Sequence, residues 1–195
     1  MNAHAENQRT ASTLNGIDVD QIEYVIGEVK NDRAFGQCQF RAKNKWVDGG
    51  INRSEIQDYF IGGKEDETRT ESFTLRADEP PLLAGSDIAP NPVEYVLHAL
   101  AACLTTTMVA HAAVRGIVIN HVESQLEGDI DLRGFLGLSE DVPRGYKEIR
   151  MYFKIDADVP DDKLKELVQL GPQYSPVFDT ITRAVPVTVQ LEKSG

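Results

Sequence analysis

The chain has 195 residues, and its 20 Lys and Arg against 31 Asp and Glu give a formal net charge of −11 at pH 7. A hydrophobic fraction of 41% with 26% charged residues is typical of a globular protein and excludes global disorder. The excess of acidic residues argues against nucleic-acid binding, because contact with a phosphate backbone requires clustered Lys and Arg.

The polar, aperiodic residues 1–20 predict a mobile N-terminal arm, followed by a single domain over residues 21–195. Residues 1–19 lack the basic and apolar regions of a signal peptide. The most apolar stretch, residues 92–114, is interrupted by a glutamate, two histidines and three threonines, so we expect no membrane contact. The expected location is the cytoplasm.

The two cysteines, Cys38 and Cys103, are too few for a disulfide scaffold and lack the spacing of a metal site. No two of the four histidines stand four residues apart, as a helical zinc site requires. We therefore expect free thiols, no metal and no cofactor.

Residues 22–75 favour strands, and two glycine pairs, 49–50 and 62–63, mark turns within them. The strand candidates are residues 34–46, 51–61 and 72–77. They predict an antiparallel sheet in the first third of the chain. The charged run 64–71 reads as a solvated turn and the start of a strand, and residues 78–90 as a loop.

The clearest element is a long helix that begins after Asn91. The run Asn91-Pro92-Val93-Glu94 has an N-cap residue, a proline at the first helical position and a glutamate that can close a capping box. Apolar residues then recur at helical spacing until Arg115-Gly116 supplies a basic last turn and a stop. The pattern predicts about six to seven turns, buried on most sides.

The rest of the chain, after the long helix, contains both predicted strands and predicted helices. The expected segments are strands over 117–132 and 146–157 with a loop over 133–145 between them, helices over 161–170 and 175–183, and a last strand over 185–191. Strands, a long helix, strands, two helices and a strand predict an α+β fold.

Cys103 is the first candidate for chemistry. It lies in the middle of the long helix among small and apolar residues, so one interpretation is a buried cysteine that acts as a small hydrophobe. A reactive thiol needs a nearby cation or a helix N-terminus to stabilise its thiolate. Cys103 lies 12 residues after the N-cap, beyond the reach of the helix dipole. Any activation must come from a basic side chain on another segment.

Glu94 is a second candidate, as a catalytic carboxylate. Nine residues of helix separate it from Cys103, which places the two on opposite faces and roughly 13 Å apart along the axis. This geometry favours the capping-box interpretation for Glu94.

Residues 85–104, GSDIAPNPVEYVLHALAACL, strongly resemble the OsmC/Ohr family, in which an Asn-Pro start introduces a long central helix that carries a reactive cysteine. The similarity continues through residues 115–117, 127–129 and 175–177 and covers roughly residues 35–192 in element order. The resemblance implies an OsmC-like fold: antiparallel sheets wrapped around a long central helix, in an intertwined homodimer with active sites at the subunit interface.

The better-studied members of this family are thiol peroxidases that reduce organic hydroperoxides. There, a thiolate on the central helix becomes sulfenic acid, and a second cysteine at the start of the last helix resolves it to a disulfide. An arginine stabilises the thiolate, and a glutamate orients that arginine. By this resemblance Cys103 matches the peroxidatic cysteine and Arg53 the arginine, although Arg53 also reads as a solvated strand residue. Glu94 stands one place later than the glutamate of the best-studied peroxidases, where this chain has Val93.

The largest departure from the family is Ser175, which stands where the peroxidases have the resolving cysteine. A serine caps a helix but cannot form a disulfide, and Cys38 could substitute only with its Cα within about 7 Å of that of Cys103. The resemblance therefore implies a single-cysteine reaction with organic hydroperoxides, reduced by an external thiol, in oxidative-stress defence. The alternative is a non-catalytic protein that binds a small hydrophobic ligand at the dimer interface.

Overall fold

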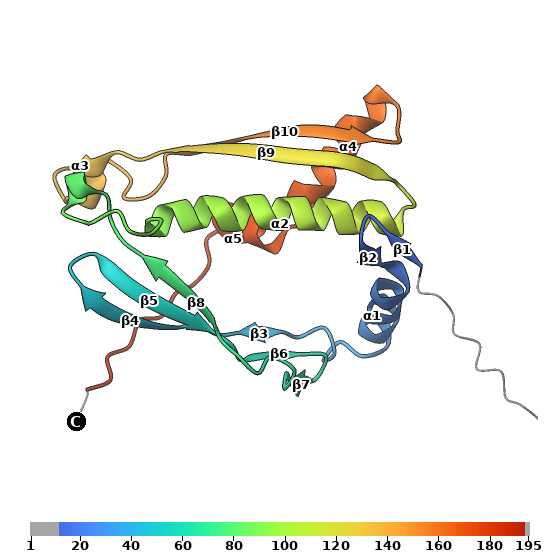
Figure 1. Ribbon diagram of the computed structural model, residues 1–195, viewed down its shortest axis with the longest axis horizontal. Coiled ribbons are helices and arrows are strands. Elements are labelled where there is room, and N and C mark those ends of the chain that lie inside the picture. Colours follow the sequence, from blue (N-terminus) through green and yellow to red (C-terminus); the bar gives the residue numbers. More distant parts are fainter. Residues whose placement is uncertain (1–11, 194–195) are drawn as a thin grey trace, which may run out of the picture. The chain divides into compact units, whose positions relative to one another are not determined.

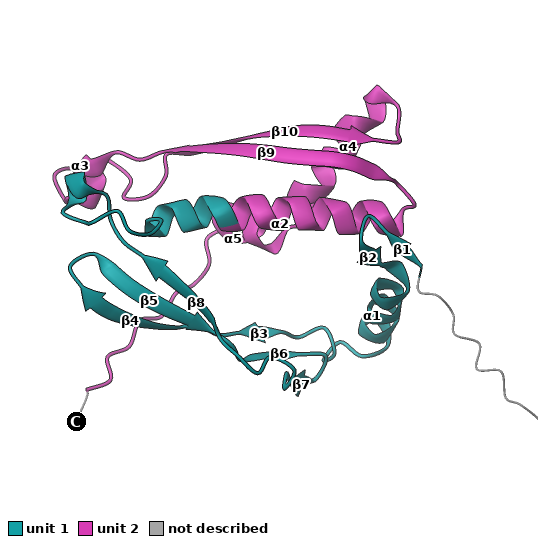
Figure 2. Ribbon diagram, in the orientation of Figure 1, with its two compact units in different colours: residues 1–98 teal, residues 99–195 magenta. Residues whose placement is uncertain are grey.

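The computed structural model describes residues 12–193 of the chain (Figure 1). It divides into two compact units, residues 1–98 and residues 99–195 (Figure 2). The boundary falls inside helix α2 (Pro92–Val114), which is continuous. The expectation of one domain over residues 21–195 stays a prediction.

The first unit begins with a short hairpin of β1 (Thr13–Leu14) and β2 (Ile17–Asp18), followed by helix α1 (Val19–Asn31). The side chain of Asp18 caps α1 by accepting a hydrogen bond from the backbone N–H of Gln21. Residues 13–20 therefore belong to regular elements instead of the predicted arm, whose residues 1–11 lie outside the described range.

The strand prediction from residue 22 onward is wrong for α1. Ile22, Val25, Ile26 and Val29 follow the helical period, but their β-branched side chains favour strands by composition. The cap at Asp18 and the 3.6-residue spacing decide the outcome.

Two small antiparallel sheets complete the first unit. The first contains β4 (Lys43–Asp48), β5 (Ile51–Ile56) and β8 (Phe73–Ala77), in the order β4-β5-β8. The second contains β3 (Gln39–Phe40), β6 (Tyr59–Ile61) and β7 (Lys64–Glu65), in the order β3-β6-β7.

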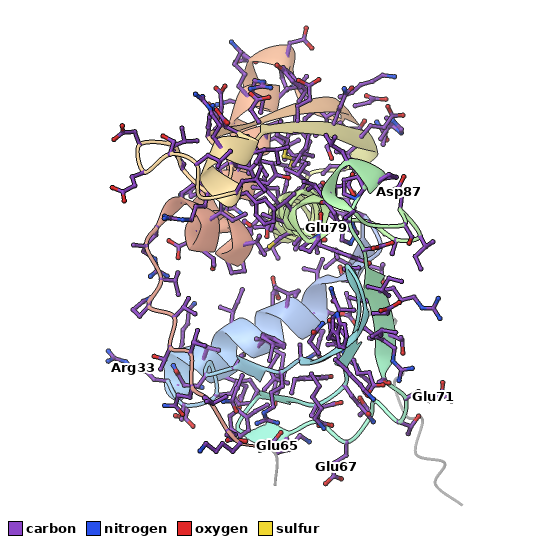
Figure 3. The ribbon with its side chains drawn as sticks, turned by 90° about the vertical axis from the view of Figure 1, so that its left-hand side faces the viewer. Arg33, Glu65, Glu67, Glu71, Glu79 and Asp87 are labelled. Carbon is purple, nitrogen blue, oxygen red and sulfur yellow. The ribbon has the colours of Figure 1, made fainter. Side chains whose placement is uncertain are left out.

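Both predicted glycine turns are confirmed, with positive φ of 51° at Gly49 and 61° at Gly62. The charged run 64–71 is confirmed as a solvated segment, since Glu65, Glu67 and Glu71 are exposed and point outward (Figure 3).

The predicted loop over residues 78–90 is confirmed, with one turn of 3-10 helix, η1 (Pro81–Leu83), inside it. Asp78 is fully buried, and its carboxylate accepts hydrogen bonds from the backbone N–H groups of Glu79, Ser86 and Ile88. Burial by itself raises the pKa of a carboxyl group, but these donors outweigh it and hold the pKa of Asp78 below its usual value. Gly85 is required because a Cβ there would stand 1.7 Å from the Glu79 carbonyl oxygen. This loop leads the chain into α2.

Helix α2 begins and ends where the sequence predicts. The capping box is reciprocal: Asn91 Oδ1 accepts from the Glu94 N–H at 2.9 Å, and Glu94 Oε2 accepts from the Asn91 N–H at 2.8 Å. Gly116 follows the last turn with a φ of 72°. The expected burial on most sides is wrong for this chain, because the buried positions form one stripe: Leu100, Leu104, Met108, Ala112 and Ala113.

By length and composition alone, α2 is also apolar enough to cross a membrane, with 28% of its most apolar window buried. The core helix of a soluble protein has the same composition, so this property does not separate the two.

The second unit is built on a long antiparallel pair, β9 (Ile119–Asp129) and β10 (Glu148–Ala157), which runs alongside α2 (Figure 1). Helices α4 (Asp161–Tyr174) and α5 (Pro176–Thr182) follow. Met108 and Ala112 of α2 and Leu167 of α4 form the buried core, with Phe153 and Ile155 of β10 packed against it.

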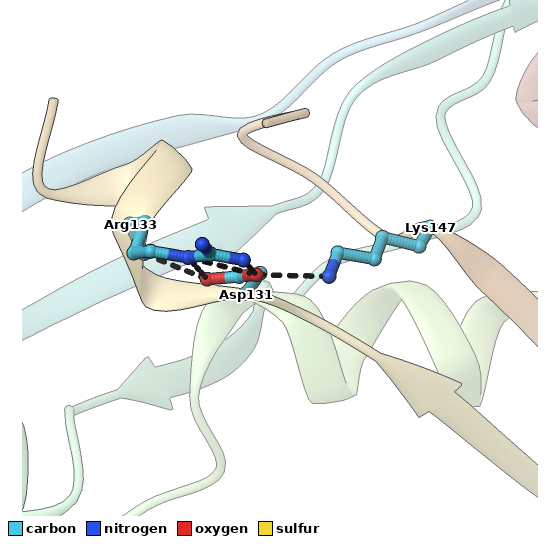
Figure 4. A network of polar contacts seen from close by, with 3 residues as sticks. All are labelled: Asp131, Arg133 and Lys147. Atoms are coloured by element: carbon cyan, nitrogen blue, oxygen red, sulfur yellow. Dashed lines mark hydrogen bonds and ion pairs between the residues drawn. The ribbon is translucent and has the colours of Figure 1, made fainter. Parts of the chain in front are cut away.

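The predicted loop over residues 133–145 contains a short helix, α3 (Leu132–Phe135). Its first turn is held by Asp131, whose carboxylate accepts hydrogen bonds from Arg133 Nη2 at 2.6 Å and Lys147 Nζ at 2.9 Å (Figure 4). These two partners, Arg133 first, hold the pKa of Asp131 well below its usual value.

The last predicted strand, residues 185–191, is wrong. The alternating apolar side chains are present, but Val187, Val189 and Leu191 are 82%, 90% and 86% exposed, and the segment pairs with no strand within the described part of the chain. A strand needs a neighbour for its backbone hydrogen bonds, which alternation alone does not supply.

Candidate active site

Cys103 lies half-buried in α2, and its sulfur is close to two hydroxyl groups. The hydroxyl of Ser175 donates a hydrogen bond to Cys103 Sγ across 3.1 Å. Thr107, one helical turn later on the same face, places its Oγ1 4.0 Å from the same sulfur. Residues 72 positions apart in the sequence thus meet at the predicted reactive thiol.

Ser175 is held rigidly between α4 and α5. It is the N-cap of α5, where its Oγ accepts from the Phe178 N–H at 3.1 Å. Its own N–H donates to the Gly171 carbonyl at 2.9 Å, and its carbonyl accepts from the Asp179 N–H at 3.1 Å. Ser175 is 2% exposed, so its hydroxyl is shielded from bulk solvent.

A close approach of α4 to α2 brings Ser175 to Cys103. Gly171 faces the backbone of α2: a Cβ there would stand 3.1 Å from the Leu104 carbonyl oxygen. Further along, the ring of Tyr174 stacks on that of His111, with centroids 4.1 Å apart and an interplanar angle of 14°. Two contacts therefore fix α4 against α2 in the turn that leads to Ser175.

The environment of His111 disfavours its protonated form. Partial burial, followed by the positive charge of Arg115, holds the pKa of His111 below its usual value. Arg115 Nη1 lies 3.1 Å from His111 Nδ1, which fits an imidazole nitrogen that accepts a hydrogen bond from the guanidinium N–H. Arg115 is 12 residues beyond Cys103, about 18 Å along the helix, too far to stabilise its thiolate directly.

The other two predicted site residues are placed in the first unit. Arg53 lies in β5, where it pairs with Glu55, and its side chain is 53% exposed. Glu94 lies in the first turn of α2, and its bond to Asn91 confirms its capping role. The polar contacts recorded for Cys103 Sγ in the described residues come from hydroxyl groups, so the approach of Arg53 to the thiol stays a prediction.

Sequence reasoning did not single out Thr107 or Tyr174, and it considered His111 only as a possible metal ligand, together with His98. Thr107 and His111 could have been assigned to the site, because they stand four and eight residues after Cys103 and so share one side of the helix. Tyr174 could not, because its stacking on His111 depends on how α4 packs against α2.

These elements and their order match a known family. The family model described as OsmC-like protein matches residues 85–190, just over half of the chain and all of α2, β9, β10, α4 and α5. The chain belongs to the OsmC-like protein family.

Several solved structures share this OsmC-like fold. An OsmC-like protein of Mycoplasma pneumoniae is 18% identical over 74% of this chain and 87% of its own, with a TM-score of 0.56. An organic hydroperoxide resistance protein OsmC of Legionella pneumophila is 18% identical over 73% of this chain and 88% of its own, with a TM-score of 0.53. An OsmC-like protein of Vibrio cholerae is 9% identical over 73% and 92%, with a TM-score of 0.53.

At these identities the likeness shows the fold alone, and it confirms the predicted α+β architecture of antiparallel sheets and a long central helix. No curated protein sequence matches the chain.

Proposed function

We propose that the protein reduces organic hydroperoxides with Cys103 as its one reacting cysteine and an external thiol as reductant, in oxidative-stress defence. The observation that carries this proposal is the placement of Cys103 Sγ on the central helix of an OsmC-like fold, with a buried hydroxyl donating to it. The similarity to a Legionella protein named for organic hydroperoxide resistance supports the choice of substrate.

The chemistry needs no cofactor. The Cys103 thiolate attacks one oxygen of the peroxide, the O–O bond breaks, and the electron pair leaves with the alkoxide, which takes a proton to become the alcohol. Sulfur is oxidised by two electrons to the sulfenate. The sulfenate takes up a proton to become the sulfenic acid. An external thiol then attacks its sulfur, water leaves, and a mixed disulfide forms. A second external thiol breaks that disulfide and returns Cys103 to its reduced form.

In this proposal the protein is a cytoplasmic homodimer, and Arg53 and Glu94 assist the reaction. Arg53 supplies positive charge to the thiolate and exchanges its present partner Glu55 for it, while Glu94 orients Arg53. The support for these roles is the family resemblance of the two positions.

The direct test is turnover of cumene hydroperoxide with dithiothreitol as the external thiol. We expect Cys103→Ser to abolish turnover above the uncatalysed rate, and Cys38→Ser, at an exposed thiol outside the proposed chemistry, to retain it. Equal rates for the wild type and Cys103→Ser would end the proposal.

One observation favours the alternative, a non-catalytic binder of a small hydrophobic ligand. Within the described residues, Val96 of α2 is 37% exposed, and the buried positions of the helix form a single stripe. Native mass spectrometry of the purified protein would show such a ligand as a bound mass. A ligand-free spectrum together with a peroxide-reactive Cys103 excludes this alternative.

A further inference from the structure

The hydroxyl of Ser175 can donate one hydrogen bond, and its acceptor is the sulfur of Cys103. Its oxygen already accepts the Phe178 N–H at 3.1 Å, so that lone pair is used by the cap of α5. The hydrogen points to Cys103 Sγ, 3.1 Å away. Accepting one hydrogen bond polarises the O–H group and strengthens the bond that it donates.

The donor is also pre-organised. The backbone of Ser175 is bonded on both sides, to Gly171 and to Asp179, and the residue is 2% exposed. A buried hydroxyl with no competing water stabilises an adjacent anion more strongly than an exposed one. Thr107, whose Oγ1 lies 4.0 Å from the same sulfur, provides a second hydroxyl.

We propose that Ser175 is a catalytic residue whose hydroxyl stabilises the anionic forms of Cys103. It donates first to the thiolate and, after oxygen transfer, to the sulfenate, whose new oxygen bears the negative charge. The second half of this role rests on the proposed function; the first half, stabilisation of the thiolate, does not. A hydrogen bond to the charged form of an acid favours that form.

Serine at this position also determines which thiol can react with the oxidised sulfur. A cysteine beside Cys103 would attack the sulfenic acid, expel water and form an S–S bond. A serine hydroxyl cannot do so and instead holds the sulfenate in place until an external thiol arrives. The same contact that activates the thiol therefore preserves its oxidised product for an intermolecular reductant.

The experiment measures alkylation of Cys103 by iodoacetamide as a function of pH, with mass spectrometry as the readout and Cys38→Ser as the background. We expect Ser175→Ala to lower the alkylation rate at about pH 7 by roughly tenfold, to move the midpoint of the pH profile upward, and to converge on the parent rate at about pH 10, where every thiol is ionised. Ser175→Thr, which keeps the hydroxyl and the cap, should restore the parent profile.

This pattern distinguishes loss of the hydrogen bond that Ser175 donates from disruption of the local structure. Loss of the α5 cap alone would loosen the site and raise alkylation at every pH, the opposite of the expected change. Circular dichroism confirms that each variant is folded. An unchanged midpoint in Ser175→Ala, or a folded Ser175→Thr that behaves like Ser175→Ala, overturns the proposal.

The sulfenate is tested separately with dimedone, which traps it covalently after one equivalent of cumene hydroperoxide. We expect the trapped fraction to decay faster in Ser175→Ala than in the parent, and equal decay overturns this half of the proposal. Alkylation requires no peroxide, so a shifted profile in a protein without turnover refutes the proposed function only. An active enzyme with an unshifted profile refutes the role of Ser175 only.

Discussion

Gly171 of α4 lies against the backbone of Leu104 in α2, at a distance that would crowd any side chain at residue 171. A Cβ at residue 171 would stand 3.1 Å from the Leu104 carbonyl oxygen and 3.3 Å from its Cδ2. Because Ser175 is bonded to Gly171 and follows it by one helical turn, this approach sets the distance between the Ser175 hydroxyl and Cys103. The contact between the Ser175 hydroxyl and the Cys103 sulfur therefore depends on the absence of a side chain at residue 171.

Replacing Gly171 with valine should push the two helices apart. We expect Gly171→Val to lower the free energy of unfolding by about 1–3 kcal/mol, as overpacking does, and to weaken the Ser175–Cys103 bond. Thermal unfolding and iodoacetamide alkylation measure the two effects. The matched control is Gly27→Ala in α1, where a Cβ meets nothing within 4 Å; it should stabilise the protein by up to about 1 kcal/mol. A valine variant as stable as the parent contradicts the packing argument.

Ser175→Cys should create the disulfide that the chain lacks. With the two side-chain atoms 3.1 Å apart in the parent, small rotations bring two sulfurs to bonding distance of about 2.05 Å. In a Cys38→Ser background, we expect oxidation to remove both thiols from a thiol count and dithiothreitol to return them. Thr180→Cys, on an exposed part of α5, is the control and should keep its thiols in the monomer. Two persistent thiols in oxidised Ser175→Cys would show that the sulfur is not placed as described.

The Asp131 ion pairs should stabilise the protein only above acidic pH. Arg133 and Lys147 hold the pKa of Asp131 below its unfolded value of about 3.9, so their stabilisation is complete above that value and is lost as the pH falls through it toward the folded pKa. We expect Asp131→Asn to lower the melting temperature above about pH 5, and this difference to shrink below about pH 4.

The control for Asp131 is Asp141→Asn, an exposed acid in the same loop, which should leave the melting temperature unchanged across the range. A deficit of Asp131→Asn that stays constant down to about pH 2 would contradict an electrostatic origin.

Glu94 offers a way to separate capping from catalysis. Glu94→Ala should lower the free energy of unfolding by about 1 kcal/mol, because it removes the acceptor for the Asn91 N–H. Glu94→Gln keeps an oxygen at that place and should retain most of the stability. If the carboxylate orients Arg53 as proposed, Glu94→Gln should still lose turnover several-fold in the cumene hydroperoxide assay. Full activity in this variant would leave Glu94 as a helix cap only.

Much of the fold could be predicted because its signals are local. Asn91, Pro92 and Glu94 lie within one turn and specify the start of α2 by hydrogen bonds among themselves, and Ser175-Pro176 does the same for α5. The glycine turns at residues 49 and 62 follow from backbone conformations that other residues avoid. Where two local signals conflicted, as in α1, composition favoured a strand and the periodicity favoured the helix that forms.

The sequence by itself determined where the long helix begins, that Cys103 lies within it, and that a serine instead of a cysteine caps the last helix. Only the tertiary structure decided that this serine and Cys103, 72 residues apart, share a hydrogen bond, and that residues 185–191 pair with no strand among residues 12–193. The reason is physical: a cap or a turn is satisfied by neighbours along the chain, whereas a contact between two helices or two strands exists only when distant segments are packed together.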